Sequence, residues 1–191
     1  LGDVYKRQDL FYLHARHHGL GIFLQPSQVP LAMERLAGQQ RLTALGQAHE
    51  TGEVRIVADL IDHLPEAKAQ HAADISIRPK GIVDNVEKPS IYQHPLHSPS
   101  EATLDYSLGL PELKEHEQLF LAFSIGISDG VNLTGSDDGV SFSARANGKT
   151  IFRQAHAKTE WAAHAIDVSQ FAGRPLVLTL AVDSIRNSSY G

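Results

Sequence analysis

The residues best suited to binding chemistry form one acidic stretch, SDGVNLTGSDDG. It brings Asp129, Asn132, Asp137 and Asp138 into a glycine-rich segment between two runs that we expect to be strands. Carboxylate and amide oxygens on a flexible loop are the hard ligands that Ca²⁺ requires. Their order matches no fixed calcium motif, and Asx turns would use the same residue types. We therefore expect either a structural calcium ion or ordinary polar turns here.

Aromatic side chains are the second group of candidates. A partly exposed ring can stack on the apolar face of a pyranose while nearby amides and carboxylates bind its hydroxyl groups. The available rings are Tyr92, Tyr106, Trp161 and Tyr190. We expect Tyr92, Trp161 and Tyr190 to contact a sugar, with a core position as the alternative for Trp161.

No set of residues has the spacing of a catalytic centre. His14, His17 and His18 have helical spacing, but no HExxH motif accompanies them, and a solvated helix end explains them more simply. The chain has no cysteine, which excludes thiolate zinc sites and cysteine nucleophiles. The two glycines of HHGLGIF precede an apolar run, so they form no phosphate-binding loop. We expect no catalytic residues and no enzymatic activity in these residues.

Charge and composition exclude two classes of binding partner. The formal charge of −5 comes from 22 acidic and 17 basic residues that are interleaved along the chain. A basic stripe for nucleic acid or anionic lipid is therefore missing from the sequence. No apolar run reaches the length of about twenty residues that a bilayer span needs. We expect neither nucleic acid nor a membrane span, and 42% hydrophobic residues suffice for a packed core.

The apolar pattern changes near residue 80. Before it, DLFYLHARHHG predicts a helix ending at Gly19 and LGIFLQ predicts a buried strand. LAMERLAGQQRLTALGQA predicts two amphipathic helical stretches, whereas VRIVADLIDHL fits either a helix or a short strand. We expect residues 9–79 to be the tail of an upstream α/β or helical domain. The proline-rich KPSIYQHPLHSPSE then favours a boundary, with a linker at residues 80–89.

The second half has the pattern of an antiparallel β-sandwich. Val140, Phe142 and Ala144 alternate with polar residues, which predicts a strand with one buried face. Asn147 and Gly148 are typical of a type I′ turn. Further strand-length runs are ATLDYSL, QLFLAFSIGI, TIFRQAHA, AAHAIDV and LVLTLAV, the last placing Leu176, Leu178, Leu180 and Val182 on one face. The overall fold class predicted is therefore α+β, with the sandwich at residues 90–191.

The elements ATLDYSLGLP, DGVSFSARANGKTIF and IDVSQFAGRPLVLTLAVD, in this order, resemble a known family. It is the novel putative carbohydrate-binding module family, whose domains accompany bacterial glycosidases. The resemblance covers residues 90–191 and implies a galactose-binding-like jelly-roll. It also implies a glycan ligand, a structural calcium ion near a loop edge, an upstream catalytic domain in the same chain and an extracellular or periplasmic location.

Three functions remain open. The first is a non-catalytic carbohydrate-binding accessory module. The second is a sandwich that braces a neighbouring domain or contacts another protein without a ligand. The third is the C-terminal fragment of a glycosidase or glycosyltransferase whose active site lies upstream. Glycan binding separates the first two, and the upstream reading frame decides the third.

Both ends of the sequence carry a signal of their own. One permitted codon set for DVYKRQ is a reading frame through the transposon mosaic end used to prepare sequencing libraries. We therefore expect residues 1–8 to be an adapter artefact of a metagenomic fragment, without fold information. Domains of the resembled family continue past NSSYG into an Asp-Trp segment, so we expect the sandwich to be truncated at its C-terminus.

Overall fold

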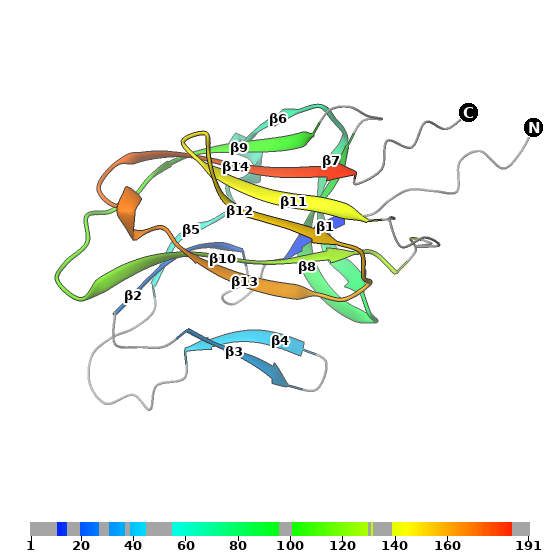
Figure 1. Cartoon of the computed structure of the whole chain (residues 1–191), viewed down its shortest axis with the longest axis horizontal. Helices are drawn as coiled ribbons and strands as arrows, with labels where there is room; N and C mark the ends of the chain where they lie inside the picture. The colour runs from blue at the N-terminus through cyan, green and yellow to red at the C-terminus, as the bar shows by residue number, and fades with distance from the viewer. Residues whose placement is uncertain are drawn as a thin grey trace, which may run out of the picture.

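The described part of the chain consists mostly of β-strands, and all but two of them form two stacked antiparallel sheets (Figure 1). The computed structural model describes residues 11–14, 20–26, 31–36, 39–44, 55–95, 101–129, 131 and 139–184. Within these ranges the helical pieces are two 3-10 turns, η1 (Leu64–Glu66) and η2 (Ser169–Phe171). No helix in the same ranges is long and apolar enough to cross a membrane. The fold is all-β, so the predicted α+β class is wrong.

The larger sheet is organised around one long strand, β10. Its strand order is β5-β2-β10-β1-β8-β7, and β13 also pairs with β10. One edge of β10 is shared end to end by β2 and β1, while β13 occupies the other edge. The strands of this sheet are β1 (Phe11–His14), β2 (Gly21–Pro26), β5 (Arg55–Asp59), β7 (Ala72–Val83), β8 (Val86–Pro95), β10 (Glu117–Ile127) and β13 (Ala162–Asp167).

The smaller sheet has the order β12-β11-β14-β9-β6. Its strands are β6 (Lys68–Gln70), β9 (Ala102–Gly109), β11 (Val140–Ala146), β12 (Lys149–His156) and β14 (Pro175–Ser184). The predicted hairpin is confirmed: β11 and β12 meet at Asn147 and Gly148, with φ values of 49° and 80°, and Phe142 is buried. A separate two-stranded hairpin joins β3 (Leu31–Leu36) to β4 (Gln39–Ala44).

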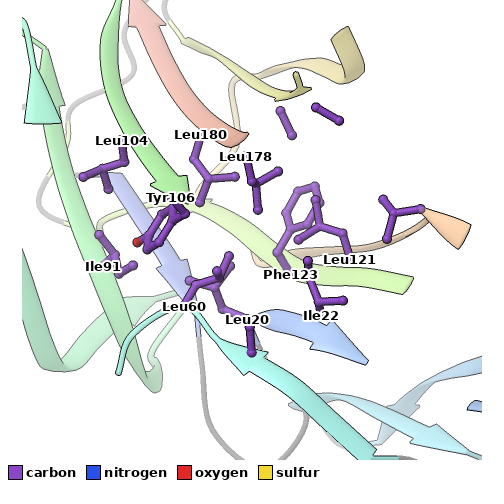
Figure 2. Packing of buried hydrophobic residues seen from close by; sticks show 14 of the residues in the cluster. Leu20, Ile22, Leu60, Ile91, Leu104, Tyr106, Leu121, Phe123, Leu178 and Leu180 are labelled. Carbon is purple, nitrogen blue, oxygen red and sulfur yellow. The ribbon is translucent and has the colours of Figure 1, made fainter. Parts of the chain in front are cut away.

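The hydrophobic core lies between the two sheets (Figure 2). Leu178 and Leu180 of β14 pack from the smaller sheet, and Leu121 and Phe123 of β10 pack from the larger one. The alternation read from LVLTLAV is confirmed, because the four residues of its apolar face, Leu176, Leu178, Leu180 and Val182, are all buried. Burying one such leucine contributes about 2 kcal/mol, so this face strongly fixes the register of β14.

The predicted N-terminal helices are wrong. Phe11–His14 is strand β1, and the stretch from Leu31 to Leu45 contains β3 and β4 instead of two helices. Segments of four to six residues are too short for helical and two-residue spacing to be told apart. The strand predicted from LGIFLQ is confirmed as β2, and the ambiguous VRIVADLIDHL contains strand β5.

The linker predicted at residues 80–89 is absent. This segment holds the end of β7, the turn at Asp84 and Asn85, and the start of β8. Strands from residues 9–79 also pair directly with β8 and β10, so they are part of the sandwich and not the tail of a separate domain. The prolines of KPSIYQHPLHSPSE misled the prediction, because Pro89 lies at the register shift between β7 and β8 and Pro95 is the last residue of β8.

Candidate functional site

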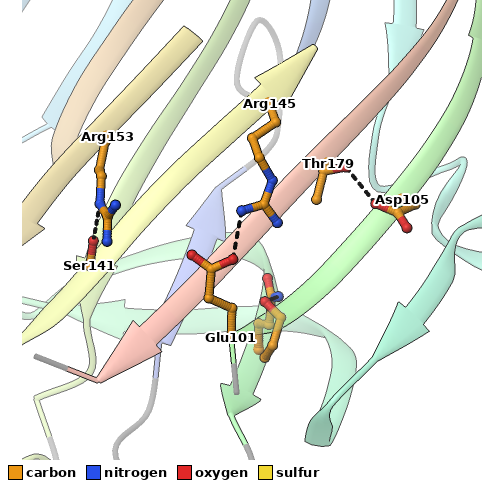
Figure 3. A network of polar contacts seen from close by, with 8 residues as sticks. Glu101, Asp105, Ser141, Arg145, Arg153 and Thr179 are labelled. Carbon is orange, nitrogen blue, oxygen red and sulfur yellow. Dashed lines mark hydrogen bonds and ion pairs between the residues drawn. The ribbon is translucent and has the colours of Figure 1, made fainter. Parts of the chain in front are cut away.

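The outer face of the smaller sheet is polar because its strands alternate. Alternate side chains of three strands are buried in the core: Leu104 and Tyr106 of β9, Leu178 and Leu180 of β14, and Phe142 and Ala144 of β11. The intervening residues therefore face outward. Asp105 pairs in register with Thr179, and Thr179 pairs with Arg145. A carboxylate, a hydroxyl and a guanidinium thus form one row across three neighbouring strands (Figure 3).

A shallow pocket of about 520 Å³ opens on this face. Its lining residues are Gln70, His71, Glu101, Thr103, Asp105, Arg145 and Thr179. The volume is within the range of roughly 300–1,000 Å³ typical of small-molecule sites. None of these lining residues carries a phenyl, phenol or indole ring. Ligand contacts in this pocket are therefore hydrogen bonds and electrostatic contacts, not ring stacking.

Asp105 is held in place by two neutral donors. The hydroxyl of Thr179 donates to Oδ1 of Asp105 at 2.6 Å, and the amide of Gln70 donates to Oδ2 at 3.3 Å. A carboxylate offers about four acceptor positions, so these two bonds leave lone pairs free. Asp105 can therefore accept further hydrogen bonds from a ligand in the pocket.

Arg145 reaches across β14 to Glu101 (Figure 3). Their Nη1 and Oε2 atoms are 2.6 Å apart, and the side chains are 25% and 32% exposed. The pair forms one wall of the pocket.

Two of the predicted sugar-contacting rings are buried elsewhere. Tyr92 and Trp161 are 3% and 5% exposed and pack with Val83 in a small cluster. Trp161 fits there because Gly126 has no side chain: a Cβ atom at Gly126 would lie 2.9 Å from Cε3 of the indole. Neither ring offers the open face that stacking on a sugar needs. Tyr106 is in the core, and Tyr190 lies outside the described residues.

Asp129 has a structural task at the edge of the predicted calcium loop. Its carboxylate accepts hydrogen bonds from the backbone N–H groups of Asp84 at 2.5 Å and Asn85 at 2.8 Å. Both turn residues have positive φ, so Asp129 clamps the β7–β8 turn. The other predicted ligands, Asn132, Asp137 and Asp138, lie outside the described residues. In the described part of the chain, no three His, Cys, Asp or Glu residues are grouped to hold a metal. The calcium site stays a prediction.

Two histidines lie near the open edge formed by β12 and β13. The ring of His164 is 4.6 Å from that of Phe152 and 5.4 Å from that of Phe123, measured between centroids. The Nε2 atom of His156 donates to the carbonyl of Glu160 at 3.0 Å. Burial lowers the pKa of both imidazoles, and the nearby His156 further lowers that of His164. These neutral rings belong to the packing of the sandwich.

The pocket residues were missed by the sequence analysis. The alternation of apolar and polar residues in the sequence is enough to assign Asp105, Arg145 and Thr179 to the polar faces of their strands. It could not show that these strands are neighbours, because the pairing joins positions far apart in the chain. The scan against protein-family models and the searches of curated proteins and solved structures found no match to this chain.

Proposed function

We propose that this chain is a non-catalytic carbohydrate-binding module whose ligand lies in the pocket on the outer face of the smaller sheet. The observation that carries the proposal is the convergence of Asp105, Glu101, Arg145 and Gln70 on one open pocket. A sugar presents hydroxyl groups that donate and accept at once. A pocket with carboxylate acceptors beside amide and guanidinium donors is complementary to such groups.

The shape of the pocket also favours a glycan. It is shallow, and it lies across four strands of a sheet from β6 to β11, so a saccharide chain could extend beyond it in either direction. Hydrogen bonds at an open surface replace bonds to water and gain little each. We therefore expect dissociation constants on the order of micromolar to millimolar. An extracellular or periplasmic location and a catalytic domain elsewhere in the same protein are part of this proposal.

Retention on polysaccharides tests the proposal. The 191-residue chain is run through native gels that contain single soluble glucans, galactans, mannans or xylans, and is applied to a printed glycan array. We expect slowed migration with at least one glycan. Asp105→Asn removes a charged acceptor and should reduce this retention about tenfold or more, because a hydrogen bond to a charged group contributes about 1.5–3 kcal/mol.

The matched control is Arg153→Gln. Arg153 lies on the same outer face, where its Nε atom donates to the hydroxyl of Ser141 at 3.3 Å, but it does not line the pocket. This variant should bind like the wild type. Binding that survives Asp105→Asn unchanged would place the glycan elsewhere on the sandwich. A chain retained by no glycan would contradict the proposal and favour a bracing role without a ligand.

A further inference from the structure

The pocket has an excess of negative charge. Its lining contains the carboxylates of Glu101 and Asp105 and the guanidinium of Arg145, which together leave one negative charge. Lys and Arg side chains normally provide the attraction for an anionic ligand. Arg145 is the sole Lys or Arg among the described lining residues. Whether an anionic ligand can bind in the pocket therefore depends on whether the guanidinium of Arg145 is free to pair with it.

Arg145 is already occupied. Its Nη1 atom is 2.6 Å from Oε2 of Glu101, the short distance of a charge-assisted hydrogen bond. Both side chains are more than half buried, so solvent screens this pair less than a fully exposed one. A carboxylate on a ligand would have to displace Glu101 and leave that second carboxylate without its cation. The ion pair thus works against anionic ligands.

Asp105 adds to the same effect. In the described part of the chain Asp105 forms no ion pair, and its hydrogen-bond partners are the neutral hydroxyl of Thr179 and the neutral amide of Gln70. A uronate or sulfate group in the pocket would meet this carboxylate directly. Like charges a few ångströms apart repel each other, whereas a neutral hydroxyl group can donate to the same oxygen atoms.

We infer that the pocket selects neutral glycans over uronic-acid-containing and sulfated ones, and that Glu101 sets this selectivity by occupying Arg145. The inference rests on the proposed function, because it specifies the ligand of that same pocket. Glu101 acts here as a specificity-determining residue. Removing the charge of Glu101 frees the guanidinium of Arg145 to bind an anion. Removing Arg145 creates no such binding group.

A pair of related polysaccharides tests the inference. Polygalacturonate and its fully methyl-esterified form share one backbone and differ in the charge of the C6 carboxyl group, and a glycan array with neutral, uronic and sulfated members broadens the comparison. The wild-type chain should be retained more strongly by the neutral members than by their anionic counterparts. Glu101→Gln should gain about two- to fivefold in retention by anionic members, the strength of one partly exposed ion pair. This gain should disappear at high salt.

Two further variants identify the group responsible. Arg145→Gln and the double variant Glu101→Gln with Arg145→Gln lack the guanidinium, so neither should gain retention by anionic glycans. Arg153→Gln serves as the control for a change of charge on the same face outside the pocket. Thermal melting of every variant establishes that it is folded, and the wild-type comparison of neutral with anionic glycans needs no variant at all.

The outcomes separate this inference from the proposed function. Equal wild-type retention by neutral and anionic glycans, still reduced by Asp105→Asn, would overturn the selectivity and leave glycan binding intact. A folded Glu101→Gln variant with unchanged preference would overturn the role of Glu101. Retention by no glycan at all would overturn the proposed function, and this inference with it.

Discussion

The Nζ atom of Lys88 lies 5.0 Å from the centre of the Trp161 ring. Lys88 is buried, and its Nζ atom has no hydrogen-bond partner among the described residues. The negative face of an indole attracts a cation, but it does not replace the hydration of an ammonium group. Burial accordingly lowers the pKa of Lys88 to about 8 from its ordinary value of 10.5.

Replacing this lysine should therefore stabilise the protein. Lys88→Met keeps a long flexible side chain beside Trp161 and removes a buried, unpaired charge. We expect the free energy of unfolding at pH 7 to rise by about 1–2 kcal/mol, at the low end of the gain found when buried ion pairs are replaced by apolar groups. Urea unfolding measures it. A variant less stable than the wild type would show that the contact with Trp161 outweighs the lost hydration.

The same lysine predicts an alkaline response. Between pH 8 and 10.5 the unfolded chain holds a proton on Lys88 that the folded chain has released. The free energy of unfolding of the wild type should therefore rise with pH through this window. Lys88→Met should lack that part of the rise. Measurements are best kept below pH 10. Burial raises the pKa of Tyr106 in the folded chain, so above pH 10 this tyrosine ionises first in the unfolded chain. That ionisation lowers the free energy of unfolding and would mask the rise due to Lys88.

The buried histidines predict a loss of stability in acid. Burial lowers the pKa of His156 and His164 below the ordinary value of 6.5, so the unfolded chain binds protons first as the pH falls. Stability is complete above pH 6.5 and decreases below it. His164→Leu removes one of these groups and should lose less stability between pH 7 and pH 5. Urea midpoints at both pH values check this.

His116→Asn is the control for that experiment. The side chain of His116 is 68% exposed, and its φ of 66° suits asparagine. We expect the control to keep the acid dependence of the wild type. If His164→Leu lost as much stability in acid as the wild type, protonation of His164 would not be a cause.

The strands after residue 100 were predictable because local sequence decides them. In β11, apolar and polar residues alternate without a break, and Asn147 with Gly148 supplies the positive φ values that the turn requires. β14 likewise carries four buried apolar residues on one face. Each pattern lies within one hairpin or one strand, so the strand can be predicted without knowing which strand pairs with it.

The first half of the fold was not predictable from such patterns. β1 is four residues long and lies between β8 and β10, whose pairing residues are far away in sequence. In β8, Pro89 looks like a strand breaker until the register shift that accommodates it is known. The pocket was missed for the same reason, because Glu101 and Arg145 meet only through the pairing of β9, β14 and β11. Non-local pairing decides both the sheet and the site.

The β11–β12 turn predicts an order of stability among variants. The Oδ1 atom of Asn147 accepts a hydrogen bond from the N–H group of Val177 at 2.8 Å. Asn147→Gly keeps a residue suited to positive φ and loses only this bond, at about 1 kcal/mol. Asn147→Ala also places an alanine in the left-handed region, for a total of about 2–3 kcal/mol. Chemical denaturation ranks the variants, and equal losses would mean that the backbone angle adds no cost.

The calcium expectation has its own test. If the segment from Asp129 to Asp138 binds Ca²⁺, millimolar calcium should raise the melting temperature, because the ion binds only the folded chain. Replacing Asp137 and Asp138 with Asn should abolish the shift. Mg²⁺ at the same concentration is the control for ionic strength. An unchanged melting curve in calcium would identify the segment as ordinary turn structure.

Asp129 should also stabilise the folded chain without calcium, and melting curves in a chelator separate this contribution from that of the ion. Asp129→Ala leaves the N–H groups of Asp84 and Asn85 without their acceptor and should cost about 1–3 kcal/mol even in a chelator. Asp129→Asn keeps one acceptor oxygen and should cost less. Asp129→Ala with wild-type stability in the chelator would mean that water replaces the carboxylate at this turn without loss.

The two carboxylates of the pocket raise the question of hydrolysis, since glycosidases use such pairs as acid and base. A general acid must carry a proton, but Glu101 is ion-paired with Arg145 at 2.6 Å. Asp105 is an acceptor for two donors, Thr179 and Gln70. We therefore expect the purified chain to release no reducing sugar from any polysaccharide that retains it. Release that Glu101→Gln or Asp105→Asn abolishes, while both variants still bind the glycan, would instead make this pocket an active site.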